Sequence, residues 1–199
     1  MCGRFFIDPD DMSDVELIAL LDREKARAEQ SALPYRLTQG EVRPGDCSAV
    51  IAMNRQLNRS AFVMQWGYRM EKRLVFNARS ETASRKAMFK ESMQTRRCLI
   101  PASAYFEWDH RDKPLQKYRF HVPEKKIIYL AGLYRFEEAA SLPVFTILTR
   151  EAAPDIACFH DRMPVIIPDS LTDAWLDRRI PPEQLLRYAV TSLAWQKVV

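Results

Sequence analysis

Short apolar segments at close spacing restrict, more than any other feature, what this chain can fold into. In the second half of the chain such segments lie at Cys98–Ile100, Ala104–Trp108, Lys117–Val122, Ile127–Tyr134 and Val144–Thr149. Turn residues separate them, and apolar segments of this length bounded by turns are typical of β-strands. Similar segments at residues 47–53, 61–68, 74–78 and 165–167 extend the pattern in both directions. The chain is therefore expected to build much of its core from antiparallel strands.

Helices are predicted between these strands. Ser13-x-x-Glu16 is a capping-box pattern that opens a helix with an apolar stripe. A second helix is predicted over residues 82–96, and another follows a cap at Asp169 or Ser170. Strands and helices mixed in this way predict an α+β fold, with a mainly antiparallel β barrel-like or sandwich core and inserted and flanking helices. The 199 residues show no repeat or linker, so a single domain over 1–199 is expected.

The composition is that of a globular protein, with 47% hydrophobic and 28% charged residues. A net charge of +4 permits nucleic-acid binding without requiring it. The chain has no apolar run long enough for a membrane span and no export leader, so a cytoplasmic location without membrane contact is expected. Its five glycines form no phosphate loop or dinucleotide fingerprint, and no cofactor is expected.

The four cysteines suggest neither a metal site nor a disulfide framework. None lies in a Cys-x-x-Cys pair, and no histidine lies at metal-ligand spacing from them. Cys47, Cys98 and Cys158 are interpreted as small core residues in a reduced protein.

Cys2 is different because it lies in the opening segment Met1-Cys2-Gly3-Arg4. If Met1 is removed, Cys2 carries a free α-amine and a thiol on adjacent carbons. At pH 7 such an amine is largely neutral and such a thiol partly ionised, so the pair can condense with an aldehyde to an imine and then a thiazolidine ring. Gly3 lets the backbone approach a ligand closely, and Arg4 offers a fixed charge for a phosphate. The alternative is that Cys2 is merely the second residue of an ordinary chain.

Asn77 and Arg79 lie at alternate positions near the end of a predicted strand, so their side chains share a face. Asn77 can orient a nucleophile through its amide, and Arg79 can hold a phosphate. The alternative interpretation is a helix N-cap followed by an exposed arginine.

Glu107 lies between Phe106 and Trp108 in a predicted strand. Aromatic surroundings would raise the pKa of its carboxyl group toward the range useful for proton transfer. The alternative is an ordinary alternating strand with Glu107 on its wet face.

His160 lies beside Asp161 and just before Arg162. A neighbouring group can set the tautomer of such a histidine, which then serves as a general acid or base. A lone histidine is equally a structural or surface residue, and Arg162 is a further candidate for binding phosphate.

Together these segments resemble a known family. The matching residues are Cys2-Gly3-Arg4-Phe5, Trp66-Gly67, Asn77-Ala78-Arg79-x-Glu81-Thr82, Phe106-Glu107-Trp108 and His160-x-Arg162-Met163-Pro164. Each piece is weak alone, but their order across residues 2 to about 167 resembles the SOS response-associated peptidase family, whose members are abasic-site processing proteins.

The resemblance implies a monomeric protein that binds single-stranded DNA containing abasic sites. After loss of Met1, Cys2 would form a thiazolidine crosslink with the opened sugar and shield the lesion. Asn77 would hold Cys2, Glu107 would assist proton transfers, and His160 would act in sugar opening and crosslink reversal. The DNA contacts implied are Arg4, Trp66, Arg79, Trp108 and Arg162. The resemblance further implies autoprocessing peptidase and lyase character.

The chain departs from the family pattern at Glu41-Val42-Arg43-Pro44-Gly45, so no DNA contact is transferred to that loop. Two other functions stay open. An N-terminal-nucleophile glutamine amidotransferase also begins Met-Cys-Gly, but usually continues with an aliphatic residue where Arg4 stands. A non-covalent single-strand-binding module would explain the arginines and tryptophans but not Cys2, Glu107 and His160.

Overall fold

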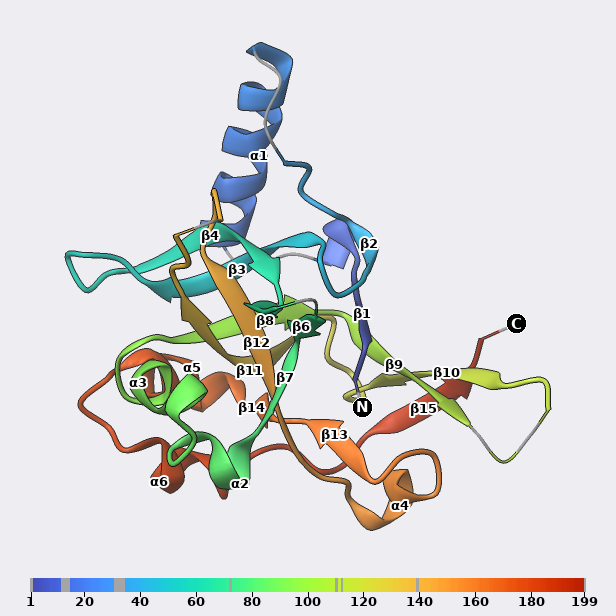
Figure 1. Ribbon diagram of the computed structural model, residues 1–199. Helices are drawn as coiled ribbons and strands as arrows, with labels where there is room; N and C mark the ends of the chain where they lie inside the picture. Colours follow the sequence, from blue (N-terminus) through green and yellow to red (C-terminus); the bar gives the residue numbers. More distant parts are fainter. Residues whose placement is uncertain are drawn as a thin grey trace.

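A computed structural model describes residues 2–11, 15–30, 35–71, 73–109, 111, 113–138 and 140–198. The strands are β1 (Arg4–Ile7), β2 (Gly40–Val42), β3 (Cys47–Met53), β4 (Arg59–Trp66), β5 (Tyr68–Met70), β6 (Arg73–Val75), β7 (Asn77–Arg79), β8 (Arg97–Ala102), β9 (Ala104–Asp109), β10 (Gln116–His121), β11 (Ile128–Arg135), β12 (Val144–Glu151), β13 (Arg162–Pro164), β14 (Ile166–Ile167) and β15 (Ala194–Lys197). The helices are α1 (Val15–Gln30), α2 (Ser80–Ala83), α3 (Ala87–Thr95), α4 (Pro154–Ala157), α5 (Thr172–Leu176) and α6 (Pro182–Leu186), with 3-10 turns at Pro9–Asp11 and Asp169–Leu171. The predicted α+β class is confirmed (Figure 1).

The first sheet has the antiparallel order β15-β10-β9-β1-β2 and is named the β1 sheet here. Strand β1 lies inside it, with Phe5 opposite Val42 of β2 on one side and Tyr105 of β9 on the other. Because β1 has a partner on both edges, the backbone of the chain start is held in a fixed place. Cys2 directly precedes this strand.

The second sheet closes on itself and is named the barrel sheet. Strand β12 pairs with β11 on one edge and with β4 on the other, and β4, β3 and β8 lead back to β11. This closure confirms the predicted barrel-like core. Beyond its contact with β4, β12 pairs in parallel with β7, where Ile147 lies opposite Asn77. The parallel pairing carries Asn77 to the edge of the barrel that faces the β1 sheet.

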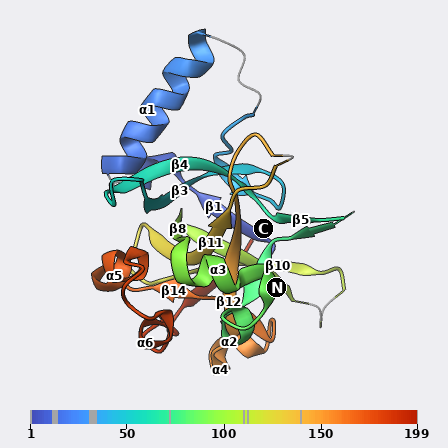
Figure 2. The same cartoon turned by 60° about the vertical axis from the view of Figure 1, so that its left-hand side comes forward.

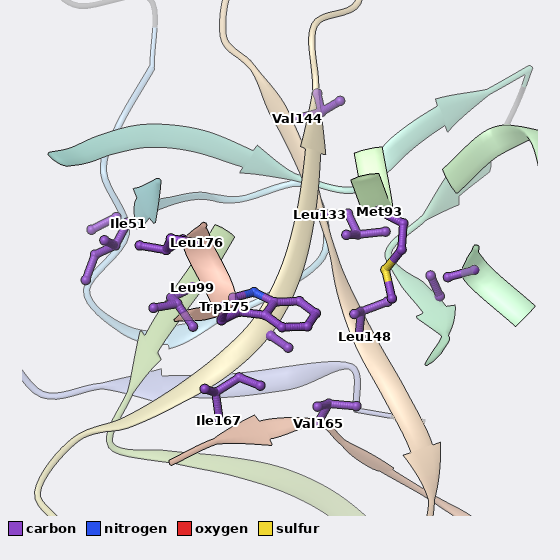
Figure 3. Close-up of a cluster of buried hydrophobic side chains, with 14 of the residues drawn as sticks. Ile51, Met93, Leu99, Leu133, Val144, Leu148, Val165, Ile167, Trp175 and Leu176 are labelled. Atoms are coloured by element: carbon purple, nitrogen blue, oxygen red, sulfur yellow. The ribbon is translucent and has the colours of Figure 1, made fainter. Parts of the chain in front are cut away.

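Two cores result because the barrel strands are buried on both faces. On β3, Val50 and Ala52 join Phe5 of β1 in an inter-sheet core. Ala49 and Ile51 join the second, helix-side core, which contains Trp175 of α5. Figure 3 shows Trp175 among its neighbours there. Its indole Nε1–H donates to the Cys98 carbonyl at 2.9 Å, so the buried polar atom is satisfied.

Helix α1 projects away from the body of the protein in both views (Figure 1, Figure 2). Its base packs through Leu17 and Leu20 in the helix-side core. Ser13, the first residue of the predicted capping box, lies outside the described residues. Within the described ranges, none of the helices is long and apolar enough to cross a membrane.

Several elements differ from the sequence-based expectation. The helix predicted over residues 82–96 is divided into α2 and α3, because Lys86 has an extended backbone with ψ of 127°. Strand β15 was not predicted, since most of its side chains are exposed and carry no apolar alternation. Backbone pairing with β10, such as Phe120 opposite Trp195, holds it in place.

Candidate active site

The candidate site lies where the chain start meets β7. Asn77 donates a hydrogen bond from Nδ2 to the carbonyl oxygen of Cys2 at 2.8 Å. Cys2 belongs to the β1 sheet side and Asn77 to the barrel sheet, so this bond ties the two sheets together at the candidate nucleophile (Figure 1). As predicted, Asn77 and Arg79 occupy alternate positions of one strand.

The Cys2 thiol is not the partly ionised group expected from the sequence. Cys2 is fully buried, and its Sγ lies 3.7 Å from the Arg4 carbonyl oxygen. Burial raises the pKa of the thiol well above its usual range, and the nearby charge of Glu107 raises it further. The thiol is therefore neutral at pH 7 in this chain, and a base must take its proton before it can react as a thiolate.

Glu107, the candidate for that base, is buried in the structure. It is only 3% exposed, so the alternative of a wet-face carboxylate is wrong. Burial raises the pKa of the Glu107 carboxyl group to about 7, and the negative charge of Asp161 adds to the shift. The pKa of Glu107 is raised, as predicted. The flanking residues Phe106 and Trp108 do not cause the rise, because their side chains point to the opposite face of β9. A carboxyl group that titrates near 7 can both give and take protons at neutral pH.

His160 follows helix α4 in the loop that leads into β13. Its Nδ1 accepts a hydrogen bond from the backbone N–H of Arg162 at 2.9 Å. The Asp161 carboxylate oxygen Oδ1 lies 2.7 Å from the same nitrogen. Because Nδ1 accepts from a backbone N–H, the proton of the neutral ring lies on Nε2. The predicted setting of the tautomer by a neighbour is thus present.

Arg162, which was predicted to contact a phosphate, is hydrogen-bonded within the protein. Its two terminal nitrogens each lie 2.8 Å from a carboxylate oxygen of Glu81, and Nη2 also donates to the Thr149 carbonyl. The Arg162 side chain is only 11% exposed. Although partial burial alone would raise the pKa of Glu81, the hydrogen bonds from Arg162 outweigh it and lower that pKa. Arg162 therefore joins β13 to the start of α2, and its charge is already neutralised.

Arg4 and Arg79 remain at the surface of the site. Arg79 is exposed and forms no ion pair within the described part of the chain. Arg4 lies 3.3 Å from Glu41, and its guanidinium lies 5.9 Å from the centre of the Trp108 ring. Arg79 is thus the more accessible of the two charges for a phosphate.

The two tryptophans that were predicted to contact DNA lie in different environments. Trp66 is fully buried between Phe5 and Phe145 in the inter-sheet core, and its Nε1 donates to the Phe76 carbonyl at 2.8 Å. Its ring has no free face for a base, so the expectation of base stacking by Trp66 is not met. Trp108 lies on the outer face of the β1 sheet, where Lys117 lies 5.5 Å from its ring centre.

Sequence reasoning missed several contributors to this region. Lys117 pairs with Glu41 and also lies 4.0 Å from the Phe106 ring centre, so cations and aromatics alternate on the outer face of the β1 sheet. Tyr105, two residues before Glu107 on β9, was also overlooked. The alternation of β9 was the available signal, because residues at i and i+2 share a face.

The remaining cysteines and acidic groups form no metal centre in the described part of the chain. All four cysteines are free. Cys47 and Cys98 are buried as predicted, whereas Cys158 is exposed, so its assignment to the core is wrong. The reason is that Cys158 caps helix α4 at the surface, where its thiol approaches the Asp155 carbonyl.

Comparison with known proteins gives a consistent result. Residues 1–199 match the model of the family described as SOS response associated peptidase (SRAP). The chain is 28% identical over 195 residues to the abasic site processing protein YoqW of Bacillus subtilis, covering 89% of this chain and 80% of that protein. It is 26% identical over 199 residues to the abasic site processing protein YedK of Escherichia coli, covering 96% and 86%. A crystal structure of a protein from Bordetella bronchiseptica has a TM-score of 0.74 and 26% identity over the whole of both chains.

Proposed function

Because this chain belongs to the SOS response associated peptidase family, we propose that it processes abasic sites in single-stranded DNA by capturing them covalently through Cys2. Its relatives YoqW and YedK are abasic site processing proteins. The observation that carries the proposal is the placement of Cys2, held by Asn77 at 2.8 Å and accompanied by a buried carboxyl group whose pKa is about 7. The crosslink would protect the lesion during the response to DNA damage.

The reaction begins once hydrolysis of the Met1–Cys2 peptide bond has freed the α-amine of Cys2. We infer that the protein itself assists this hydrolysis, in keeping with the description of its family as peptidases. The amine adds to the aldehyde carbon C1′ of the opened sugar and forms a carbinolamine. Loss of its hydroxyl group as water leaves an imine. The thiol then adds to the imine carbon, a C–S bond closes the ring, and the thiol proton passes to nitrogen. One water is lost overall, and nothing is oxidised or reduced.

Glu107 and Asn77 serve this sequence in different ways. Protonated Glu107 gives a proton to the departing hydroxyl, and ionised Glu107 takes the proton of the buried thiol. A pKa of about 7 makes both forms available at neutral pH. Asn77 fixes the Cys2 backbone through its carbonyl oxygen, so the amine and thiol are presented in one orientation.

His160 is assigned to the steps that involve the sugar ring. Opening the ring moves a proton from the C1′ hydroxyl group to the ring oxygen. Reversal of the crosslink breaks the C–S bond, returns a proton to the thiol, and then adds one water to the imine, which releases the amine and restores the aldehyde. His160 is partly exposed, with 20% of its side chain accessible, and its Nδ1 is held by the backbone N–H of Arg162. Lyase character would instead follow from β-elimination at the imine, in which a base removes a C2′ proton and the 3′ phosphate leaves.

The DNA strand is proposed to cross the surface beside β7 and the outer face of the β1 sheet. Arg79 supplies an exposed charge for one phosphate, and Arg4 a second charge next to Trp108. Trp108 offers an apolar surface to a base, in the manner of single-strand-binding proteins. Arg162 acts indirectly, by holding the loop that contains His160 against Glu81.

Intact-mass measurement tests the proposal. The trimmed protein, incubated with a single-stranded oligonucleotide containing one abasic site, should gain the mass of the oligonucleotide less one water and keep it after denaturation. Cys2→Ala should lose this adduct, whereas Cys158→Ser should retain it although it removes the exposed thiol. Equal heat-stable adduct from Cys2→Ala would show that the nucleophile is another residue.

The two other functions predict different outcomes in the same preparation. A glutamine amidotransferase would release ammonia from glutamine, and abasic-site capture predicts no such release. A non-covalent binding module would retain the oligonucleotide under native conditions and lose it on denaturation.

A further inference from the structure

The hydroxyl group of Tyr105 is buried without a hydrogen-bond partner in the described part of the chain. Tyr105 is fully buried. A buried hydroxyl without a partner destabilises a folded protein, by roughly 1–3 kcal/mol in mutational data, so such groups are uncommon away from binding sites. Tyr105 is therefore a candidate for a group that meets its hydrogen-bond partner only when a ligand is bound.

Its position points to the chemistry of Cys2. Tyr105 and Glu107 are two residues apart on β9 and share the inward face of the β1 sheet. Tyr105 lies opposite Phe5, close to the chain start, and belongs to the same buried cluster as Cys2. Burial raises the pKa of the Tyr105 hydroxyl well above its usual range, and ionisation of Cys2 or Glu107 would raise it further.

The ring of Tyr105 is held rigidly. It stacks on Phe120 with ring centres 5.0 Å apart and planes 15° apart. Phe120 in turn meets Phe159 edge to face at 5.3 Å, and Phe159 directly precedes His160. The hydroxyl oxygen is therefore fixed by packing, and only its O–H bond can rotate to meet a partner.

We propose that the Tyr105 hydroxyl group donates a hydrogen bond to the oxygen on C1′ of the opened abasic sugar while the Cys2 amine attacks that carbon. This inference rests on the proposed function. The carbonyl oxygen gains negative charge as the C–N bond forms, and a fixed donor aimed at that oxygen stabilises the transition state more than the ground state. A proton of the attacking amine then passes to this oxygen and gives the carbinolamine hydroxyl. Glu107 protonates that hydroxyl, which leaves as water, and Tyr105 keeps its own proton throughout. Its raised pKa keeps it neutral over the working pH range.

Tyr105→Phe tests this role because it removes only the hydroxyl oxygen. The rate of adduct formation under single-turnover conditions should fall by on the order of tenfold to a hundredfold. Affinity for an oligonucleotide containing a tetrahydrofuran site, which has no aldehyde, should stay within twofold. The unfolding midpoint should not fall, because the hydroxyl makes no hydrogen bond to any residue that the structure describes.

Tyr68→Phe is the matched control. Tyr68 is also fully buried, but it lies in the helix-side core and its hydroxyl is hydrogen-bonded to Ser92 at 3.4 Å. This variant should lower the unfolding midpoint and leave the rate of adduct formation unchanged.

The outcomes separate the two proposals. A wild-type protein that forms no adduct overturns the proposed function and this inference with it. A wild-type protein that forms the adduct at the same rate as Tyr105→Phe overturns only the role of Tyr105. A variant that unfolds, or loses affinity for the tetrahydrofuran site by the same factor as it loses rate, shows a structural or general binding role and also overturns the inference.

Discussion

Asn77 Nδ2 and the carbonyl oxygen of Cys2 are hydrogen-bonded at 2.8 Å across the junction of the two sheets. Because residue 77 comes from a strand that pairs in parallel with β12, the barrel sheet presents its amide to the start of the β1 sheet. The candidate nucleophile is thus positioned by a residue far away in sequence, and its orientation depends on the packing of one sheet against the other.

Replacing Asn77 should lower the rate of adduct formation and cause only a small loss in the free energy of unfolding. Asn77→Ala removes the donor that holds the Cys2 carbonyl, and we expect the single-turnover rate to fall by on the order of tenfold or more, because orientation of the nucleophile is lost. The free energy of unfolding should fall by about 1 kcal/mol for the lost hydrogen bond. Asn58→Ala, at an exposed turn position, should leave the rate unchanged. An unaltered rate in Asn77→Ala would contradict the positioning role.

Glu107 should make the stability of the folded protein depend on pH. Its pKa is raised from 4.5 to about 7 in the folded state, so the protonated form is favoured by folding. The stabilisation is complete below pH 4.5 and is lost as the pH rises through about 7, with a total of about 3 kcal/mol. Urea unfolding of the wild type should therefore show decreasing stability across this window.

Glu107→Gln should remove this contribution, because the amide has no proton to lose. Glu138→Gln, at an exposed position, should keep the wild-type dependence. The capture rate of the wild type should change with pH around 7, where Glu107 titrates. Glu107→Gln should remove this change. The same slope of stability with pH in both variants would show that another group titrates.

Arg79 should contribute to the salt dependence of DNA binding. Each phosphate neutralised by the protein releases counterions, so Arg79→Gln should lower the slope of log K against log salt concentration by about 1. Arg187→Gln, which alters an exposed arginine whose Nε donates to the Gln184 carbonyl, should leave the slope unchanged. Fluorescence anisotropy with a labelled single strand measures both. Equal slopes for Arg79→Gln and the wild type would place the DNA elsewhere.

Arg162 and Glu81 should behave as a coupled pair. Their two contacts of 2.8 Å link β13 with α2, but Glu81 is about half exposed, so solvent screens the pair. A double-mutant cycle with Arg162→Gln and Glu81→Gln should give a coupling free energy of about 1 kcal/mol. Purely additive effects on unfolding would show that the ion pair contributes nothing.

Gly132 tests the close packing of the barrel sheet. A Cβ atom at this position would lie 2.4 Å from Ile100 Cδ1 and 2.9 Å from Cys98 Sγ. Gly132→Ala should therefore destabilise the protein by about 1–3 kcal/mol through overpacking. Gly45→Asn is the comparison variant, at a turn where an added Cβ atom would lie 3.7 Å from the nearest side-chain atom. Gly45 has φ of 97°, and asparagine is among the residues that tolerate this left-handed region best. A wild-type unfolding midpoint for Gly132→Ala would contradict this packing.

The sequence predicted those strands and helices whose formation depends on residues close to them in the chain. Strands such as β3, found at the predicted residues 47–53, have local apolar patterns that backbone geometry converts directly into structure. The exposed strand β15 has no such pattern, and only its pairing with β10 holds it. The long predicted helix was divided because packing of residues 83 and 89 into the core outweighs local helix propensity.

The sequence by itself determined which reactive residues the protein has, including the family motifs at Cys2, Glu107 and His160. Only the tertiary structure decided which of them are buried, which are paired and which remain open to a ligand. Glu107 became a group that titrates near 7, Trp66 became a core residue, and Arg162 became the partner of Glu81. The physical reason is that burial and ion pairing depend on segments that are far apart in the chain and meet only when the two sheets pack together.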